Sequence, residues 1–271
     1  MLYLICDCRN AGVNSDSGVE NVNLYDMIGK RQTVRDFQMK QIEETVLKGF
    51  RRYVGEMFSP YPDIPYRVET VCSLEEKVGK GLFFVKAPYY ISFLTEESKE
   101  ALLNAGYIME ELSLYLAARG IGTCYQGLLK IKKEQEGLKE VLVMAAGYPK
   151  RYLYREEGSA KRMSLSRVCV FKEEPSKELT AILRAAVLAP SSLNSQPWRF
   201  VVYKNRVHVF MQKSNKIAAM QRLNMIDIGI ALNHMLITAE ELWVEAELKE
   251  LDNISSQSFK NNHYITSLMI K

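Results

Sequence analysis

The sequence lacks the features that would assign it to several classes of protein. Its five cysteines form no Cys-x-x-Cys pair, and no secretory leader is recognised at its start, so we expect reduced thiols in a cytoplasmic protein. No apolar run approaches the ~18 residues that a membrane-spanning helix needs. The three histidines lie far apart along the chain, and this spacing predicts no metal site.

Charged residues are not concentrated in one place either. The formal net charge is +4 over 271 residues, and a short basic run such as 130–133 is followed by Glu134 and Glu136. This pattern is typical of a solvated helix face rather than a nucleic-acid interface. With 47% hydrophobic and 25% charged residues, the chain can bury a sizeable core, and its length suits one large domain or two ordinary ones.

Two segments resemble each other when the sequence is shifted by 123 positions. Residues 104–116 and 227–239 each begin with a residue suited to an N-cap, Asn104 or Asp227, and have a glycine two positions on. Each continues as a helix that is apolar on most of its circumference, which is expected of a helix buried on every side. Either the chain is a fused duplication, or two buried helices resemble each other simply because both are buried.

The repeat predicts two α+β halves, 1–150 and 151–271, joined by the polar stretch 149–160. Each half is expected to contain a helix, a second helix, a strand, a long buried helix and a strand. The segments that support this order are the helix starts at 44–48 and 180–184 and the alternating strands at 90–94 and 207–211. Residues 1–6 are also interpreted as a strand.

The most informative stretch is 189–200, which follows an apolar helical pattern and precedes a strand-like run. A Pro-Ser-Ser-x-Asn turn presents hydroxyls, an amide and backbone N–H groups in one place. Such a turn suits a planar heterocycle rich in hydrogen-bonding atoms. Trp198 and Phe200 are expected core anchors, whereas no structural role is evident for Ser191, Ser192 and Asn194.

A basic segment near the N-terminus, 31–35, suits a phosphate. If it is extended, alternate side chains share a side, so Arg31 and Arg35 flank the hydroxyl of Thr33. Arginine donates paired, charge-assisted hydrogen bonds to phosphate oxygens. The alternative is a surface turn with salt bridges such as Arg35 to Asp36.

Residues 117–127 contain three glycines, which end the preceding helix and would let the backbone approach a ligand. A plain glycine-rich helix C-cap is the alternative. The spacing is not a dinucleotide-binding fingerprint, because Tyr125 stands at the third glycine position and the segment follows a helix rather than a strand.

These three segments resemble motifs of the FMN-dependent nitroreductase family. Residues 189–200 resemble its A-P-S-S-x-N-x-Q-P-W-x-F signature, and 31–35 resemble its R-x-S-x-R phosphate motif with Thr33 in place of serine. Residues 120–127 resemble its G-x-G-T-x-W-x-G loop, and the basic pair Lys161–Arg162 follows a turn similar to the one that closes the family fold. The signature lies late in the chain. The chain therefore most resembles the tandem, pseudo-dimeric branch of the family, which is called TM nitroreductases.

The resemblance implies a nitroreductase-like α+β fold with antiparallel or mixed sheets flanked by helices, in which two fused half-domains form an intrachain pseudo-dimer. It implies one FMN per chain, bound by residues of both halves. The implied cofactor-binding residues are Arg31, Gln32, Thr33, Arg35, Tyr125, Gln126, Gly127, Arg162, Pro190, Ser191, Ser192 and Asn194. Arg162 is either a further phosphate ligand or a remnant of the second half's own Arg-x-Ser segment.

The activity implied by the resemblance is a ping-pong oxidoreductase. NAD(P)H would reduce the flavin, and a nitroaromatic, a quinone or a similar small acceptor would reoxidise it. No catalytic side chain is named, because the flavin carries the chemistry. The alternatives are a flavin-binding protein that has lost turnover, and an enzyme of the same fold that dehalogenates or oxidises ring systems. The chain is expected to be a monomeric pseudo-dimer, with further homodimerisation left open.

Overall fold

The computed structural model describes residues 23–78, 84–126, 129–131, 137–156, 158–213, 218–255 and 262–271. The chain divides into two compact units, Met1–Glu157 and Gly158–Lys271, where the sequence predicted a division after Lys150. The predicted strand at 1–6 and the predicted cofactor ligand Gly127 lie outside the described residues.

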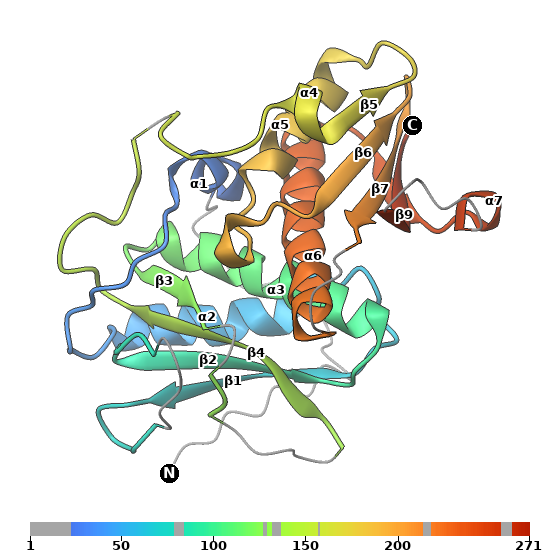
Figure 1. Cartoon of the computed structure of the whole chain (residues 1–271). Helices are drawn as coiled ribbons and strands as arrows, with labels where there is room; N and C mark the ends of the chain where they lie inside the picture. The colour runs from blue at the N-terminus through green and yellow to red at the C-terminus, as the bar shows by residue number, and fades with distance from the viewer. Residues whose placement is uncertain are drawn as a thin grey trace. The chain divides into compact units, whose positions relative to one another are not determined.

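The first unit is a helix-covered antiparallel sheet. Its elements are α1 (Leu24–Lys30), α2 (Glu44–Glu56), β1 (Tyr66–Cys72), β2 (Tyr89–Thr95), α3 (Lys99–Ala117), β3 (Gly122–Tyr125) and β4 (Lys139–Gly147). The strand order is β1-β2-β4-β3, with antiparallel pairing at each step. α3 packs against β2, β3 and β4, and both α1 and α2 pack against α3 (Figure 1).

The long helix α3 is buried over most of its length, as predicted. Its start was predicted wrongly at Asn104. The N-cap is Ser98, whose side chain accepts a hydrogen bond from the backbone N–H of Ala101. The helix ends at Ala117, just before the expected Gly120, which has φ +82°, and the backbone N–H of Ile121 donates to the carbonyl oxygen of Leu116 at 3.0 Å.

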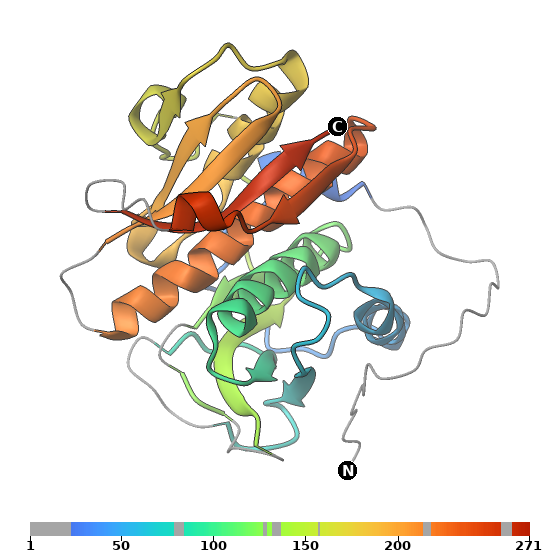
Figure 2. The same ribbon diagram turned by 90° about the vertical axis from the view of Figure 1, so that its right-hand side faces the viewer.

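The second unit is also a sheet with one long helix lying along it (Figure 2). Its elements are α4 (Leu165–Val168), β5 (Cys169–Phe171), α5 (Lys177–Leu188), the 3-10 turn η1 (Ser192–Asn194), β6 (Trp198–Val202), β7 (Arg206–Gln212), α6 (Ala218–Glu241), β8 (Ala246–Lys249), α7 (Asp252–Ser255) and β9 (Asn262–Ile270). The strand order is β5-β6-β7-β9-β8. β5 runs parallel to β6, and the other pairs are antiparallel.

The two units repeat one topology. The order β1-β2-β4-β3 of the first sheet matches β6-β7-β9-β8 of the second, and α3 and α6 each follow the second strand of these sets. The predicted strands at 90–94 and 207–211 are confirmed as β2 and β7. The predicted order of elements was incomplete. Each unit has an additional strand, β1 or β6, before the strand that precedes its long helix, and two strands instead of one after that helix.

Asp227 was predicted as the N-cap of the second long helix, and this prediction is wrong. α6 begins at Ala218, so Asp227 lies inside the helix, as Asn104 does in α3. Trp198 and Phe200 are confirmed as core anchors, with 0% and 1% of their surfaces exposed. Within the described residues, the structure contains no helix with the length and apolar character needed to cross a membrane.

Candidate functional site

The basic segment 31–35 runs as extended chain along β3. Thr33 forms a parallel bridge with Thr123, and the backbone N–H of Val34 donates to the carbonyl oxygen of Thr123 at 2.9 Å. Arg31 forms an antiparallel bridge with Tyr154. The extended conformation predicted from the sequence is therefore present, and backbone hydrogen bonds fix its register.

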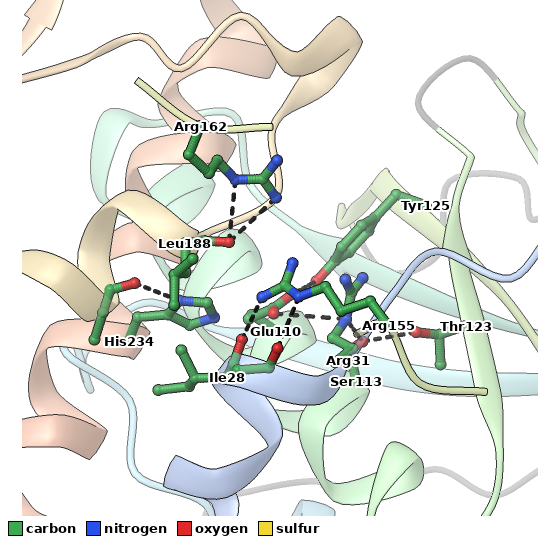
Figure 3. A network of polar contacts seen from close by, with 12 residues as sticks. Ile28, Arg31, Glu110, Ser113, Thr123, Tyr125, Arg155, Arg162, Leu188 and His234 are labelled. Carbon is green, nitrogen blue, oxygen red and sulfur yellow. Dashed lines mark hydrogen bonds and ion pairs between the residues drawn. The ribbon is translucent and has the colours of Figure 1, made fainter. Parts of the chain in front are cut away.

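Arg31 is the centre of a buried polar network in the first unit (Figure 3). Its Nε donates to the Ser113 hydroxyl at 2.6 Å and lies 3.6 Å from a carboxylate oxygen of Glu110. Tyr125 donates its hydroxyl to the other Glu110 oxygen at 2.7 Å, and the hydroxyls of Ser113 and Thr123 are 2.7 Å apart. Side chains from α3 and β3 thus fix the guanidinium of Arg31.

One nitrogen of that guanidinium has no partner among the residues that the structure describes. Arg31 Nη2 is buried and makes no hydrogen bond to any described residue, although a buried N–H group ordinarily has a partner. An anion such as a phosphate would supply the missing acceptor. The donor chemistry at Arg31 therefore fits the phosphate of FMN.

The neighbouring side chains differ in their surroundings. Thr33 is half-buried and Arg35 is exposed, and neither makes a side-chain hydrogen bond or ion pair with another described residue. Gln32 instead donates to the backbone carbonyls of Tyr152 and Tyr154 at 3.1 and 2.9 Å. The salt bridge considered between Arg35 and Asp36 is absent from the described residues, and Asp36 pairs with Lys150 at 2.8 Å.

Part of the glycine-rich stretch, Gly122–Tyr125, is the strand β3 rather than a loop. A Cβ added to Gly122 would lie 2.5 Å from Val34 Cγ2, so this glycine is required for the close packing of β3 against the basic segment. The Gln126 side chain is also turned inward, because its Oε1 accepts the backbone N–H of Val85 at 3.0 Å. The side chains of Tyr125 and Gln126 therefore have internal roles, and the prediction that they contact flavin stays untested.

Sequence reasoning missed three residues that support this site. Glu110 and Ser113 bind Arg31, as described above. Arg155 donates to the carbonyls of Gly29 and Ile28 at 2.8 and 2.7 Å and so caps α1 just before Arg31 (Figure 3). Glu110 and Glu111 stand out as adjacent carboxylates in the mostly apolar stretch 104–116, and a buried one requires a partner, but the sequence does not tell which of the two is buried.

In the second unit, the Pro-Ser-Ser-x-Asn turn has an unusual backbone. Leu193, Asn194 and Gln196 have φ values of 53°, 54° and 47°, a left-handed conformation that is rare outside glycine. Pro190 is half-buried, and Leu193 is 90% exposed. We call residues 191–196 the signature loop.

Three polar side chains of the signature loop, Ser191, Ser192 and Asn194, have internal hydrogen-bond partners, whereas the buried Ser195 hydroxyl has none among the described residues. The Ser191 hydroxyl accepts the backbone N–H of Gln196 at 2.9 Å. Arg162 donates to the Asn194 amide oxygen at 3.1 Å and, from Nε and Nη2, to the carbonyl of Leu188. The inference that Ser191, Ser192 and Asn194 lack a structural role is therefore wrong, because these side chains hold the strained backbone.

Ser192 is held by a buried carboxylate. Its backbone N–H lies 3.0 Å from each Asp227 oxygen, and its hydroxyl donates to Oδ1 at 3.2 Å. Burial raises the pKa of Asp227 to about 7, and the hydrogen bonds from Ser192 offset only part of that effect.

A profile of one protein family matches residues 23–239 of the chain, and that family is described as "Putative TM nitroreductase". The chain belongs to this nitroreductase family. The match includes the basic segment, the glycine-rich strand and the signature loop, so the family predicted from those motifs is confirmed.

Comparison with solved structures confirms the nitroreductase fold. The crystal structure of a "putative nitroreductase" from Thermotoga maritima is 20% identical in sequence, matches 96% of this chain and 99% of that chain, and gives a TM-score of 0.64. The α+β nitroreductase-like fold with two sheets is thus as predicted.

Other similar structures match about half of the chain. A putative NADH oxidase from Clostridium acetobutylicum is 18% identical over 53% of this chain and 97% of that chain, with a TM-score of 0.44. A nitroreductase with bound FMN from Desulfitobacterium hafniense DCB-2 is 14% identical over 52% of this chain and 97% of that chain, with a TM-score of 0.42. Comparison with curated proteins gave no match.

Proposed function

We propose that this nitroreductase family member is an FMN-dependent oxidoreductase that takes reducing equivalents from NAD(P)H. The observation that supports the proposal most directly is the buried Arg31 guanidinium, whose Nη2 has no partner among the described residues. It lies in the segment that matches the phosphate motif of the family. A fixed cation with a free N–H suits the phosphate of a mononucleotide.

In the first unit, three side chains would hold the phosphate. Arg31 is preorganised by Glu110 and Ser113, the Thr33 hydroxyl is half-buried beside it in sequence, and Arg35 is exposed and unpaired within the described residues. Because Arg31 is already fixed, little side-chain entropy would be lost on binding.

The contribution of the second unit to this site is a proposal from the sequence alone. The family resemblance assigns flavin contacts to Pro190, Ser191, Ser192 and Asn194, with Arg162 as a further candidate. It also leads us to propose one FMN per chain, since the first half has no second copy of the signature loop.

When bound, FMN supplies the hydride and electron transfer chemistry. The residues of the chain would bind and orient it, and the cations at Arg31 and Arg35 would favour its negatively charged forms. We propose nitroaromatics, quinones or similar small molecules as acceptors.

The test is to titrate the purified full chain with FMN and to follow the flavin absorbance and its fluorescence quenching. We expect saturation at one FMN per chain and NAD(P)H consumption in the presence of menadione or a nitrofuran. Arg31→Ala should weaken FMN binding at least tenfold, since a charge-assisted hydrogen bond contributes about 1.5–3 kcal/mol.

Arg51→Ala is the matched control, because Arg51 forms an exposed pair with Glu44 and its loss should leave FMN affinity unchanged. A protein that binds no FMN would overturn the proposal. Stoichiometric FMN binding without NAD(P)H consumption would contradict the oxidoreductase activity and leave a flavin-binding protein.

A further inference from the structure

The signature loop keeps a backbone conformation that its sequence does not favour. Three non-glycine residues, Leu193, Asn194 and Gln196, have φ between 47° and 54°. Such residues persist only where surrounding contacts over-determine them. The contacts that hold this loop therefore decide whether it keeps its shape.

Asp227 makes a buried contact with this loop. It projects from the interior of α6, is 2% exposed, and accepts the backbone N–H and the hydroxyl of Ser192. Its carboxylate thus binds the residue that comes just before the left-handed stretch, and a helix fixes its position.

The internal repeat provides a comparison for this contact. Asn104 occupies the position in α3 that corresponds to Asp227 in the 123-residue shift. Its amide also holds the loop that follows the preceding helix: Asn104 Oδ1 accepts the Tyr61 backbone N–H at 3.1 Å, and its Nδ2 donates to the Tyr61 carbonyl at 2.8 Å. The two units therefore use the same position for the same purpose, but only the second uses a group that can ionise.

No charged group of the described residues contributes to the shifted pKa of Asp227. On the packed elements α5, β7 and β8 the charged and titratable groups are Lys177, Glu178, Arg184, Arg206, His208, Glu247 and Lys249. On α6 itself they are Arg222, His234, Glu240 and Glu241. Arg162 binds Leu188 and Asn194 instead. Among the described residues, the hydrogen bonds to the Asp227 carboxyl come from Ser192.

We propose that Asp227 is a positioning residue that makes the order of the signature loop depend on pH. The consequence for flavin rests on the proposed function, in which this loop contacts the cofactor. The effect on the loop itself does not, and it can be measured on the chain without FMN.

The direction of the dependence follows from linkage. With the loop closed, burial raises the pKa of Asp227 from 3.8 to about 7. A state in which the loop opens and water reaches the carboxyl returns the pKa toward its ordinary value. The closed state therefore binds the proton more tightly, so that low pH favours the closed loop. The opening equilibrium constant rises with pH up to about 7 and is constant above it.

The test is hydrogen–deuterium exchange of the full chain without FMN at several pH values between about 5.5 and about 8, corrected for the intrinsic exchange rate. We expect the opening constant of the amides at 192–196 to increase at least tenfold over this range. In Asp227→Asn the same amides should show no dependence on pH, because the amide cannot ionise. The loop held by Asn104, residues 58–65, is an internal control in the same sample, and its opening constant should not change with pH.

A signature loop whose corrected exchange is independent of pH in the wild-type chain would overturn the proposal. An equal pH dependence in Asp227→Asn would also overturn it, since another group would then be responsible. FMN is added in a separate experiment. If the pH dependence is found but FMN gives the signature loop no protection, the role of Asp227 stands and the flavin contact of the loop is refuted.

Discussion

Arg31 and Glu110 form an ion pair inside the first unit, with side chains only 6% and 0% exposed and Nε 3.6 Å from Oε1. Glu110 lies on the buried helix α3, and Arg31 begins the segment proposed to hold a phosphate. A buried pair of this kind gains little stability over an apolar pair, but it fixes the position of each partner strongly. Its purpose here is to hold a guanidinium in one place.

Removing one partner of this ion pair should destabilise the folded chain. We expect Arg31→Ala or Glu110→Gln to lower the free energy of unfolding by about 3–5 kcal/mol, because each leaves a charge buried without its partner. The double variant Arg31→Ala/Glu110→Gln should lose less than the sum of the single losses. Urea unfolding followed by circular dichroism measures all three, and additive losses would show that the two residues are not coupled.

The close packing of β3 against the basic segment should make Gly122 intolerant of a side chain. A Cβ at this position would lie 2.5 Å from Val34 Cγ2, so Gly122→Ala should lower the free energy of unfolding by about 1–3 kcal/mol. Adding Val34→Ala should recover part of that loss. Gly29→Ala is the control, since a Cβ there meets nothing within 4 Å and the alanine should stabilise α1 by about 0.5–1 kcal/mol. Equal effects at the two glycines would contradict this account.

Asp227 should also make the stability of the second unit depend on pH. Its pKa of about 7 in the folded chain lies above the ordinary value of 3.8, so its contribution to stability is present in acid and is lost as pH rises toward 7. When the pH is raised from about 5 to about 8, the free energy of unfolding of Asp227→Asn should rise by about 2–3 kcal/mol relative to that of the wild type. Thermal or urea unfolding at the two pH values measures this. Asp36→Asn alters an exposed pair with Lys150 and is the control. Its free energy of unfolding relative to the wild type should barely change between the two pH values, and a rise equal to that of Asp227→Asn would contradict the assignment to Asp227.

Two buried thiols should resist alkylation. Burial raises the pKa of Cys169 to about 12, and burial also raises the pKa of Cys124, although the nearby charges of Arg35 and Arg31 lower it in part. Because the thiolate is the reactive species, iodoacetamide at a pH of about 8 should leave both unmodified in the native chain and should modify both in urea. Peptide mapping by mass spectrometry tests this, and rapid native labelling of either residue would refute it.

The regular elements were largely predictable because each depends on a local pattern. The strands β2 and β7 follow from alternation, the burial of α3 and α6 from their apolar circumference, and the end of α3 from Gly120. The starts of α3 and α6 were predicted wrongly. Asn104 and Asp227 have good N-cap side chains, but they use them to hold distant loops, and no local rule distinguishes these two uses.

The amino-acid sequence by itself determined the family, the α+β class and the extended basic segment, because short motifs and periodic apolar positions carry that information directly. Only the tertiary structure decided what the polar side chains do. It showed that Glu110 and Ser113 hold Arg31, that Gly122 serves packing against Val34, and that Asp227 holds Ser192. These pairings join residues far apart in the chain, since a buried charge or hydroxyl takes whichever partner the folded backbone brings within hydrogen-bonding distance.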